Sequence, residues 1–190
     1  MSGYAKTKTM KYFHKESLSS TNDVAKKIIN KKDSIIDQGF VVTTDKQTAG
    51  KGTKGKSWYS ESSGGLYYSL AIKPKTFDFE KVETYHIEIA EAISDVILKI
   101  ANIKATIKWP NDLYYMGKKI GGILMESACK AEENSNLDYL IIGIGLNINQ
   151  TSFPEDITNT ATSLYLETNK KLNKKLFIKP LTVKLKKLFS

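Results

Sequence analysis

The chain has 190 residues, of which 41% are hydrophobic and 26% are charged, and its formal net charge is +9. These proportions are typical of one soluble globular domain, and no apolar run approaches the ~20 residues that a membrane-spanning helix needs. A single cysteine excludes an internal disulfide, and one cysteine with two histidines cannot form a zinc site of the usual kind without carboxylates.

The lone cysteine and the positive charge indicate where the protein acts and what it binds. Cys129 suits a reducing compartment, and the N-terminus lacks the apolar segment of a signal peptide, so we expect a cytoplasmic protein. All 29 cationic residues are lysines, which are flexible point charges without the planar fork of arginine. The positive net charge indicates an anionic partner, such as a nucleotide, a nucleic acid or an acidic protein.

The N-terminal half alternates strands with helices. Strands are predicted at residues 10–15, 40–44 and 65–73. Ser20 has the position of an N-cap, and the helix that it begins continues through residues 24–32. The clearest helix spans residues 79–101, because its apolar residues recur on one face at helical spacing, and we expect that face to pack in the core.

The C-terminal half contains more strands than helices. Strands are predicted at residues 105–108, 113–116, 119–126 and 139–144. Gly117 and Lys118 read as the turn of a hairpin, residues 130–137 as a polar turn and residues 148–163 as a loop. A lysine-rich amphipathic helix closes the chain, beginning after Pro180 at the latest. The pattern predicts an α+β fold with a mixed or antiparallel sheet.

A glycine-rich loop after the second strand satisfies two phosphate-binding patterns at once. Gly50, Gly52 and Gly55 spell G-x-G-x-x-G, and the stretch from Gly50 to Ser57 spells G-x-x-x-x-G-K-S. Both motifs hold phosphate at the N-terminus of a helix that starts directly after the glycines. Residues 62–65 are poor helix formers and a strand follows them, which disfavours both interpretations.

The same loop concentrates positive charge on a flexible backbone. Its lysines are Lys46, Lys51, Lys54 and Lys56. Free backbone amides beside such charge favour an anion-binding loop that orders around its ligand, and a plain structural turn is the alternative.

Polar residues and glycines also cluster at the ends of later strands. Asn111 and Asp112 follow a short strand, where they can face a ligand or form an Asx turn. Gly122 lies in a strand close to Lys119, which indicates a ligand packed against the backbone or a bulge. Asn147 follows a buried strand that is rich in small residues.

Taken in order, these stretches resemble the catalytic domain of biotin–protein ligases. They are residues 20–22, 47–58, 108–112, 119–126 and 143–147. The resemblance implies a mixed β-sheet flanked by helices, of the biotin/lipoate ligase catalytic-domain type. It implies one catalytic domain over residues 1–190, with no N-terminal DNA-binding domain and with a C-terminal β-rich domain absent or truncated.

The resemblance also implies a reaction in two steps. Biotin and ATP, with Mg²⁺, form biotinyl-5′-AMP and pyrophosphate, and the biotinyl group then passes to a lysine of a biotin carboxyl carrier protein of a carboxylase. Two anions must meet in the first step, so fixed positive charge is required. No specific DNA or membrane partner is expected, and a homodimer is left open.

The resemblance assigns roles to individual residues of this chain. Lys119 and Lys51 are expected to act in catalysis, with Lys119 bridging the reacting carboxylate and the α-phosphate. The biotin-binding residues are expected to be Ser20, Thr21, Asn22, Gln47, Gly50, Lys51, Gly52, Lys119, Gly122 and Gly145. The ATP-binding residues are expected to be Lys54, Trp58, Asn111, Asp112 and Asn147, with Asp112 as a Mg²⁺ contact.

The glycine loop departs from the usual family pattern, which is rich in arginine. Lysines at positions 51, 54 and 56 keep the charge but lose the forked geometry, and Thr53 carries no charge. We therefore predict that this chain holds the adenylate less tightly than relatives with arginines in the loop.

Two other functions remain as alternatives. A lipoate–protein ligase shares the fold and the adenylation chemistry, but the Gly-Lys loop and residues 108–112 favour biotin. A lysine-rich nucleic-acid-binding module would also explain the net charge, but the lysines are spread along the chain and no recognition helix is evident.

Overall fold

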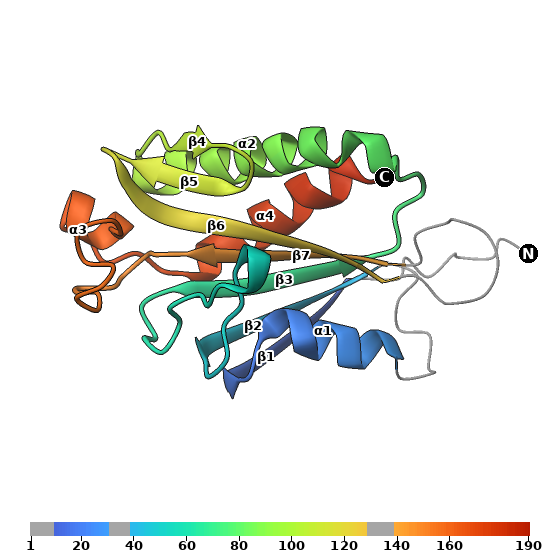
Figure 1. Ribbon diagram of the computed structural model, residues 1–190, viewed down its shortest axis with the longest axis horizontal. Coiled ribbons are helices and arrows are strands. Elements are labelled where there is room, and N and C mark those ends of the chain that lie inside the picture. Colours follow the sequence, from blue (N-terminus) through green and yellow to red (C-terminus); the bar gives the residue numbers. More distant parts are fainter. Residues whose placement is uncertain (1–9, 31–38, 129–138) are drawn as a thin grey trace, which may run out of the picture.

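The computed structural model describes residues 10–30, 39–128 and 139–190. These residues form a seven-stranded sheet in the order β1-β2-β3-β7-β6-β5-β4 (Figure 1). The strands are β1 (Lys11–Leu18), β2 (Phe40–Gln47), β3 (Leu66–Ile72), β4 (Thr106–Lys108), β5 (Asp112–Tyr115), β6 (Lys118–Ala128) and β7 (Tyr139–Leu146). The polar turn predicted at residues 130–137 lies outside the described residues.

The sheet is mixed, as the sequence predicts. β1 and β2 are parallel, because helix α1 (Thr21–Asn30) connects them, and every other neighbouring pair is antiparallel. The turn between β5 and β6 consists of Met116 and Gly117, with φ values of 47° and 78°. Positive φ at both positions is typical of a tight hairpin turn, which therefore lies one residue earlier than the predicted Gly117-Lys118 pair.

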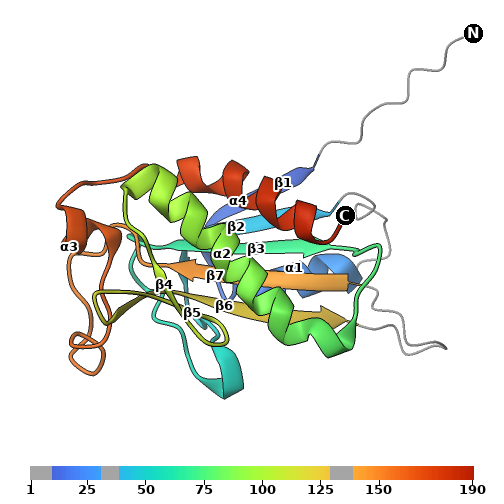
Figure 2. The same ribbon diagram turned by 90° about the horizontal axis from the view of Figure 1, so that it is seen from above.

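Helices cover the two faces of the sheet unequally. Helix α2 (Val82–Ala101) and helix α4 (Lys175–Leu188) lie over one face, whereas α1 lies on the other (Figures 1 and 2). Successive side chains of β2 point to opposite faces of the sheet and pack under different helices. Phe40 and Val42 pack in the cluster beneath α1, and Val41 packs in the cluster beneath α2 and α4. Among the described helices, none combines the length and apolarity that crossing a membrane requires.

The last helix begins before Pro180. α4 starts at Lys175 and includes Pro180, whereas the sequence set only a latest start, after Pro180. Its buried residues include Phe177, Leu181 and Leu185, whereas Val183 is 60% exposed. Burial of these large side chains offsets the helix-breaking tendency of proline. The short helix α3 (Leu164–Thr168) was not predicted.

Candidate active site

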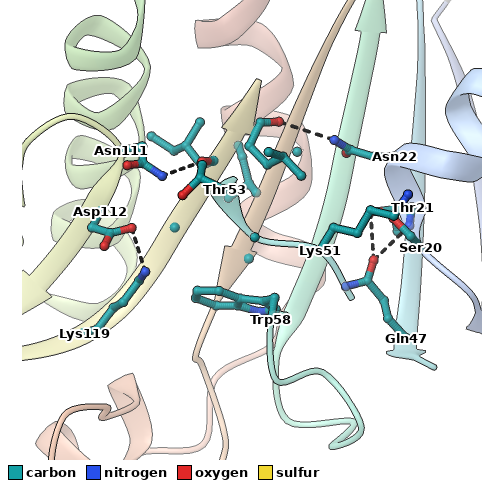
Figure 3. Close-up of a pocket in the computed structure, with 17 residues that line it drawn as sticks. Ser20, Thr21, Asn22, Gln47, Lys51, Thr53, Trp58, Asn111, Asp112 and Lys119 are labelled. Carbon is teal, nitrogen blue, oxygen red and sulfur yellow. Dashed lines mark hydrogen bonds and ion pairs between the residues drawn. The ribbon is translucent and has the colours of Figure 1, made fainter. Parts of the chain in front are cut away.

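A small pocket opens where α1, the glycine loop after β2, and strands β5, β6 and β7 meet (Figure 3). Its walls are Ser20, Thr21, Asn22, Gln47, Lys51, Gly52, Thr53, Trp58, Asn111, Asp112, Lys119, Gly122, Ile123, Leu124, Gly143, Ile144 and Gly145. The pocket volume is about 50 Å³, well below the roughly 300–1,000 Å³ of ordinary small-molecule sites. The loop and the Trp58 side chain cover the strands and account for the small volume in this conformation.

The structure brings most of the predicted site residues to this pocket. The exceptions are Gly50 and Asn147, which line a neighbouring cavity, and Lys54, which lines neither. Lys54 is exposed and has a positive φ of 54° in the short helical turn η1 (Thr53–Gly55). Its role in ATP binding therefore stays a prediction that this conformation does not support. Thr53, in contrast, lines the pocket.

The glycine loop forms a short hairpin instead of the N-terminus of an α-helix. Lys51 pairs with Ser57 as an isolated β-bridge, and the Trp58 amide donates a hydrogen bond to the Gly50 carbonyl at 3.0 Å. This geometry is consistent with our rejection of both phosphate-loop patterns, because no α-helix follows the glycines. The loop can offer backbone groups to a ligand through Lys51 and Gly52, which line the pocket.

The Lys51 side chain ties this loop to α1. Its Nζ lies 2.6 Å from Asp23 Oδ1, and the side chains are 46% and 26% exposed. The hydrogen bond to Asp23 raises the pKa of the Lys51 ammonium, so this lysine remains charged at neutral pH. The ion pair therefore links the covering loop to α1 in the conformation seen here.

Polar side chains from α1 and β2 form one end of the pocket. The Thr21 amide donates a hydrogen bond to Gln47 Oε1 at 2.8 Å, and the Thr21 hydroxyl lies 2.7 Å from the Ser69 hydroxyl. Asn22 Oδ1 accepts a hydrogen bond from Ser69 at 2.5 Å. Ser20, Thr21, Asn22, Gln47 and Ser69 are all buried, so their polar groups are shielded from bulk water. A ligand that enters this end must match their hydrogen-bonding pattern.

Lys119 and Asp112 form the opposite side of the pocket. Lys119 Nζ lies 2.7 Å from Asp112 Oδ1, and Figure 3 shows this pair across the pocket from Asn22 and Thr21. Both backbone groups of Lys119 are hydrogen-bonded, since its amide donates to the Thr160 carbonyl at 2.8 Å and its carbonyl accepts from the Thr162 amide at 3.0 Å. The ammonium therefore projects from a fixed strand position.

Trp58 lies between these two sides, against the backbone of β6 and β7. A Cβ at Gly145 would lie 2.5 Å from Trp58 Cε2, and a Cβ at Gly122 would lie 3.0 Å from Trp58 Cζ3. The strand glycines thus make room for the indole, while Lys119 Nζ lies 5.3 Å from its ring. The indole Nε1 is buried and has no hydrogen-bond partner among the described residues, so it remains available as a donor.

A second, larger cavity of about 620 Å³ adjoins the pocket and shares Gln47, Trp58 and Lys119 with it. Its other walls include Tyr59 and Phe153, whose rings meet edge to face at 6.4 Å. Asn147 also lines this cavity, but its side chain is already engaged: Nδ2 donates to the Lys119 carbonyl at 3.4 Å and Oδ1 accepts from Gln150 at 3.1 Å. Its observed contacts therefore support the strand that carries Lys119.

The described part of the chain has few side chains that could bind a metal ion tightly. Within residues 10–30, 39–128 and 139–190, no group of three or more His, Cys, Asp or Glu side chains is placed to hold one. Asp112 supplies one carboxylate at the pocket. A Mg²⁺ ion usually takes one or two protein carboxylates and completes its shell with water and substrate phosphates, so Asp112 fits a Mg²⁺ that arrives with a nucleotide.

Sequence reasoning missed Ser69 and Glu126, which lie behind the pocket wall. Glu126 accepts a hydrogen bond from Asn22 at 2.7 Å and one from Lys26 at 2.6 Å. Both residues lie within predicted strands, and the only signal for Glu126 was a charged residue in an apolar strand that includes Ile123 and Leu124.

Comparison with known proteins places the chain in a family. The model of the Biotin/lipoate A/B protein ligase family matches residues 15–147. The "Bifunctional ligase/repressor BirA" of Bacillus subtilis (strain 168) is 36% identical over 159 residues, which cover 83% of this chain and 47% of that protein. "Biotin--protein ligase 1, chloroplastic" of Arabidopsis thaliana is 36% identical over 135 residues, which cover 69% of this chain and 34% of that protein. The chain thus spans about half the length, or less, of these curated relatives.

Solved structures share the fold. The biotin protein ligase of Aquifex aeolicus in complex with biotin and ATP has a TM-score of 0.76 and 31% identity, covering 95% of this chain and 72% of that chain. The Leishmania major biotin protein ligase in complex with biotinyl-5-AMP has a TM-score of 0.75 and 28% identity, covering 92% and 73%. The mixed seven-stranded sheet and its flanking helices are those of biotin protein ligase catalytic domains, and the chain belongs to the biotin/lipoate A/B protein ligase family.

Proposed function

We propose that this chain is an ATP-dependent biotin–protein ligase, which activates biotin as biotinyl-5′-AMP and transfers it to a lysine of a biotin carboxyl carrier protein. One observation carries the proposal: the Lys51 loop, the polar residues of α1 and the Lys119 side chain line a single pocket. Relatives named as biotin ligases, and related structures that hold biotin with ATP or biotinyl-5-AMP, support biotin as the ligand.

The polar end of the pocket suits the head group of biotin. Its cyclic urea carries N–H donors beside a carbonyl acceptor, and Thr21, Asn22 and Gln47 present matching polar atoms. The valeryl chain would extend past Gly122 toward Lys119, where its carboxylate meets the nucleotide. The dithiolane of lipoate has no N–H group, so it would leave these buried groups unpaired.

In the first step, a biotin carboxylate oxygen attacks the α-phosphorus of ATP, the bond to the β-phosphate breaks, and pyrophosphate leaves. Lys119 would neutralise the charge that gathers between the two anions. In the second step, the carrier lysine amine attacks the activated carbonyl and loses a proton, and AMP leaves. Positioning and charge neutralisation are sufficient for both steps, so no covalent enzyme intermediate is needed.

The neighbouring cavity would accommodate the nucleotide. Trp58 borders both cavities and can present its ring face and its unpaired indole N–H to ATP. Asp112 would contact a Mg²⁺ bound to the phosphates, and that ion would supply further positive charge. Because the biotin pocket is small in this conformation, we infer that the loop from Gly50 to Ser57 moves outward when biotin enters.

Pyrophosphate release tests this function. We expect release from ATP to require biotin, and we expect a biotin carboxyl carrier protein to become labelled on lysine when both substrates are present. Lipoate serves as the control substrate for the nearest alternative. Release that is independent of biotin, or that lipoate supports equally well, would refute the proposal. Binding to random DNA that biotin leaves unchanged would favour the nucleic-acid alternative instead.

A further inference from the structure

We propose that Glu126 is a positioning residue that fixes the hydrogen-bonding pattern offered to the biotin head group. The inference rests on the proposed function, because it concerns how the pocket reads that ligand. Glu126 belongs to β6, and its side chain is 23% exposed behind the pocket wall. One carboxylate oxygen accepts from Lys26 Nζ at 2.6 Å, and the other accepts from Asn22 Nδ2 at 2.7 Å.

These contacts decide which way the Asn22 amide points. The Glu126 carboxylate oxygens accept from Lys26 and Asn22, and the Leu124 carbonyl, 3.4 Å from Asn22 Nδ2, is also an acceptor. The NH₂ group of Asn22 must therefore face both of them, which turns Oδ1 toward Ser69. Asn22 is 3% exposed, so water cannot satisfy the opposite orientation.

The orientation of Asn22 then sets the direction of the next hydrogen bonds. Ser69 Oγ lies 2.5 Å from Asn22 Oδ1, which cannot donate, so the single hydroxyl proton of Ser69 must go to Asn22. Ser69 Oγ also lies 2.7 Å from Thr21 Oγ1, and Ser69 has no second proton for that contact. The proton of the Thr21 hydroxyl therefore goes to Ser69 Oγ or to Gln47 Oε1, which lies 3.2 Å away, and in neither case to a ligand.

The chain of hydrogen bonds ends at the pocket. With its proton committed, Thr21 Oγ1 can only accept from a ligand. Gln47 Oε1 accepts from the Thr21 amide at 2.8 Å, which leaves the Gln47 NH₂ group free to donate. The pocket thus offers acceptors on the α1 side and a donor at Gln47, which complements the N–H groups and the carbonyl of a cyclic urea. A reversed Asn22 would replace an acceptor by a donor.

Four proteins test this inference: the unmodified chain, Glu126→Leu, Glu126→Gln and Lys26→Met. For Glu126→Leu, which lacks the acceptor, we expect the KM for biotin in pyrophosphate release to rise about ten- to a hundredfold. The kcat at saturating biotin and the KM for ATP should stay within about threefold, because Glu126 does not touch the reacting atoms. The preference for biotin over lipoate should fall in parallel with the biotin KM.

Two variants serve as controls. Glu126→Gln should keep the biotin KM within about threefold, since its amide oxygen can still accept from Asn22 while Lys26 turns toward water. Lys26→Met should have a similarly small effect, because it leaves the Glu126–Asn22 hydrogen bond in place. An unchanged biotin KM in Glu126→Leu, or equal losses in kcat and in both KM values, would overturn the inference.

A measurement on the unmodified chain covers the case in which Glu126→Leu does not fold. The Asn22 side-chain amide, assigned by its loss in Asn22→Ser, should give one pair of slowly exchanging N–H signals in NMR spectra. Two orientations, or rapid exchange with water, would overturn the inference. Lack of biotin-dependent pyrophosphate release by the unmodified chain would refute the proposed function, whereas the amide measurement tests the positioning role separately.

Discussion

Replacement of Lys119 by methionine removes the positive charge that the proposed reaction needs most. Methionine retains an unbranched side chain of similar length, so packing beside the Trp58 ring, 5.3 Å from Lys119 Nζ, changes little. The variant therefore separates the charge of Lys119 from its bulk.

The structure allows a rough magnitude for this loss. The Lys119 side chain is only 30% exposed and Asp112, its ion-pair partner at 2.7 Å, is 24% exposed. At an effective dielectric constant of about 20, two unit charges about 4 Å apart interact by roughly 4 kcal/mol. Removal of one preorganised group that stabilises a transition-state anion costs about 2.7–4 kcal/mol in enzymes. We therefore expect Lys119→Met to lower kcat for biotin-dependent pyrophosphate release by about 10²- to 10³-fold.

The assay is pyrophosphate release at saturating biotin and ATP, with thermal unfolding as a check on folding. Lys118→Met is the matched control, because Lys118 is adjacent in β6 but exposed and outside both cavities, and its rate should be unchanged. Lys119→Arg keeps the charge and should lose far less activity than Lys119→Met. A folded Lys119→Met protein that retains more than about a tenth of the rate would refute the reasoning.

Three further changes test other parts of the structure. In Gly145→Ala the new Cβ would lie 2.5 Å from the Trp58 ring, so the indole must shift, and calorimetry should show ATP affinity about tenfold lower or worse. Thr53→Arg adds a forked cation to the pocket wall, and biotinyl-5′-AMP should dissociate about tenfold more slowly in a filter-binding chase; equal rates would contradict the lysine-for-arginine argument. Burial raises the pKa of Asp45, but the hydrogen bond and charge of Lys174 outweigh it and leave that pKa below 3.8. Asp45→Asn should therefore destabilise the protein above pH 3.8, and the difference from the unmodified chain should disappear as pH falls through the lowered pKa in urea titrations.

Local patterns in the sequence were sufficient for most of the secondary structure. Apolar spacing identified α2, and alternation with turn residues identified the strands, because each of these signals depends on neighbours within a few positions. Pro180 left the start of α4 open in the sequence, and burial of Phe177 and Leu181 outweighs the helix-breaking tendency of proline. Tertiary packing decided that boundary, and no local signal reports it.

Some residues of the candidate site could also be predicted from the sequence, and others could not. Lys119 and Asp112 could be predicted from the order of the motifs, although nothing in their spacing shows that their charged atoms lie 2.7 Å apart. Glu126 could not be predicted, because its role depends on Asn22, 104 residues earlier, reaching it across the pocket wall. That contact follows from α1 crossing the face of the sheet on which β6 and β7 present Glu126 and Gly143. Chain topology, and not residue spacing, creates it.

Each of the two lysines of the pocket forms an ion pair with an aspartate, and these ion pairs explain how a site without arginine can be organised to bind anions. Lys119 is held by Asp112 and Lys51 by Asp23, so each flexible ammonium already has a defined position. Such partly exposed pairs contribute only about 0–1 kcal/mol each, whereas a hydrogen bond to a charged group contributes about 1.5–3 kcal/mol. A carboxylate or phosphate that enters the pocket can therefore share or replace the aspartates at low cost. Arginine would supply defined geometry through its own planar fork, and here the neighbouring aspartates supply it instead.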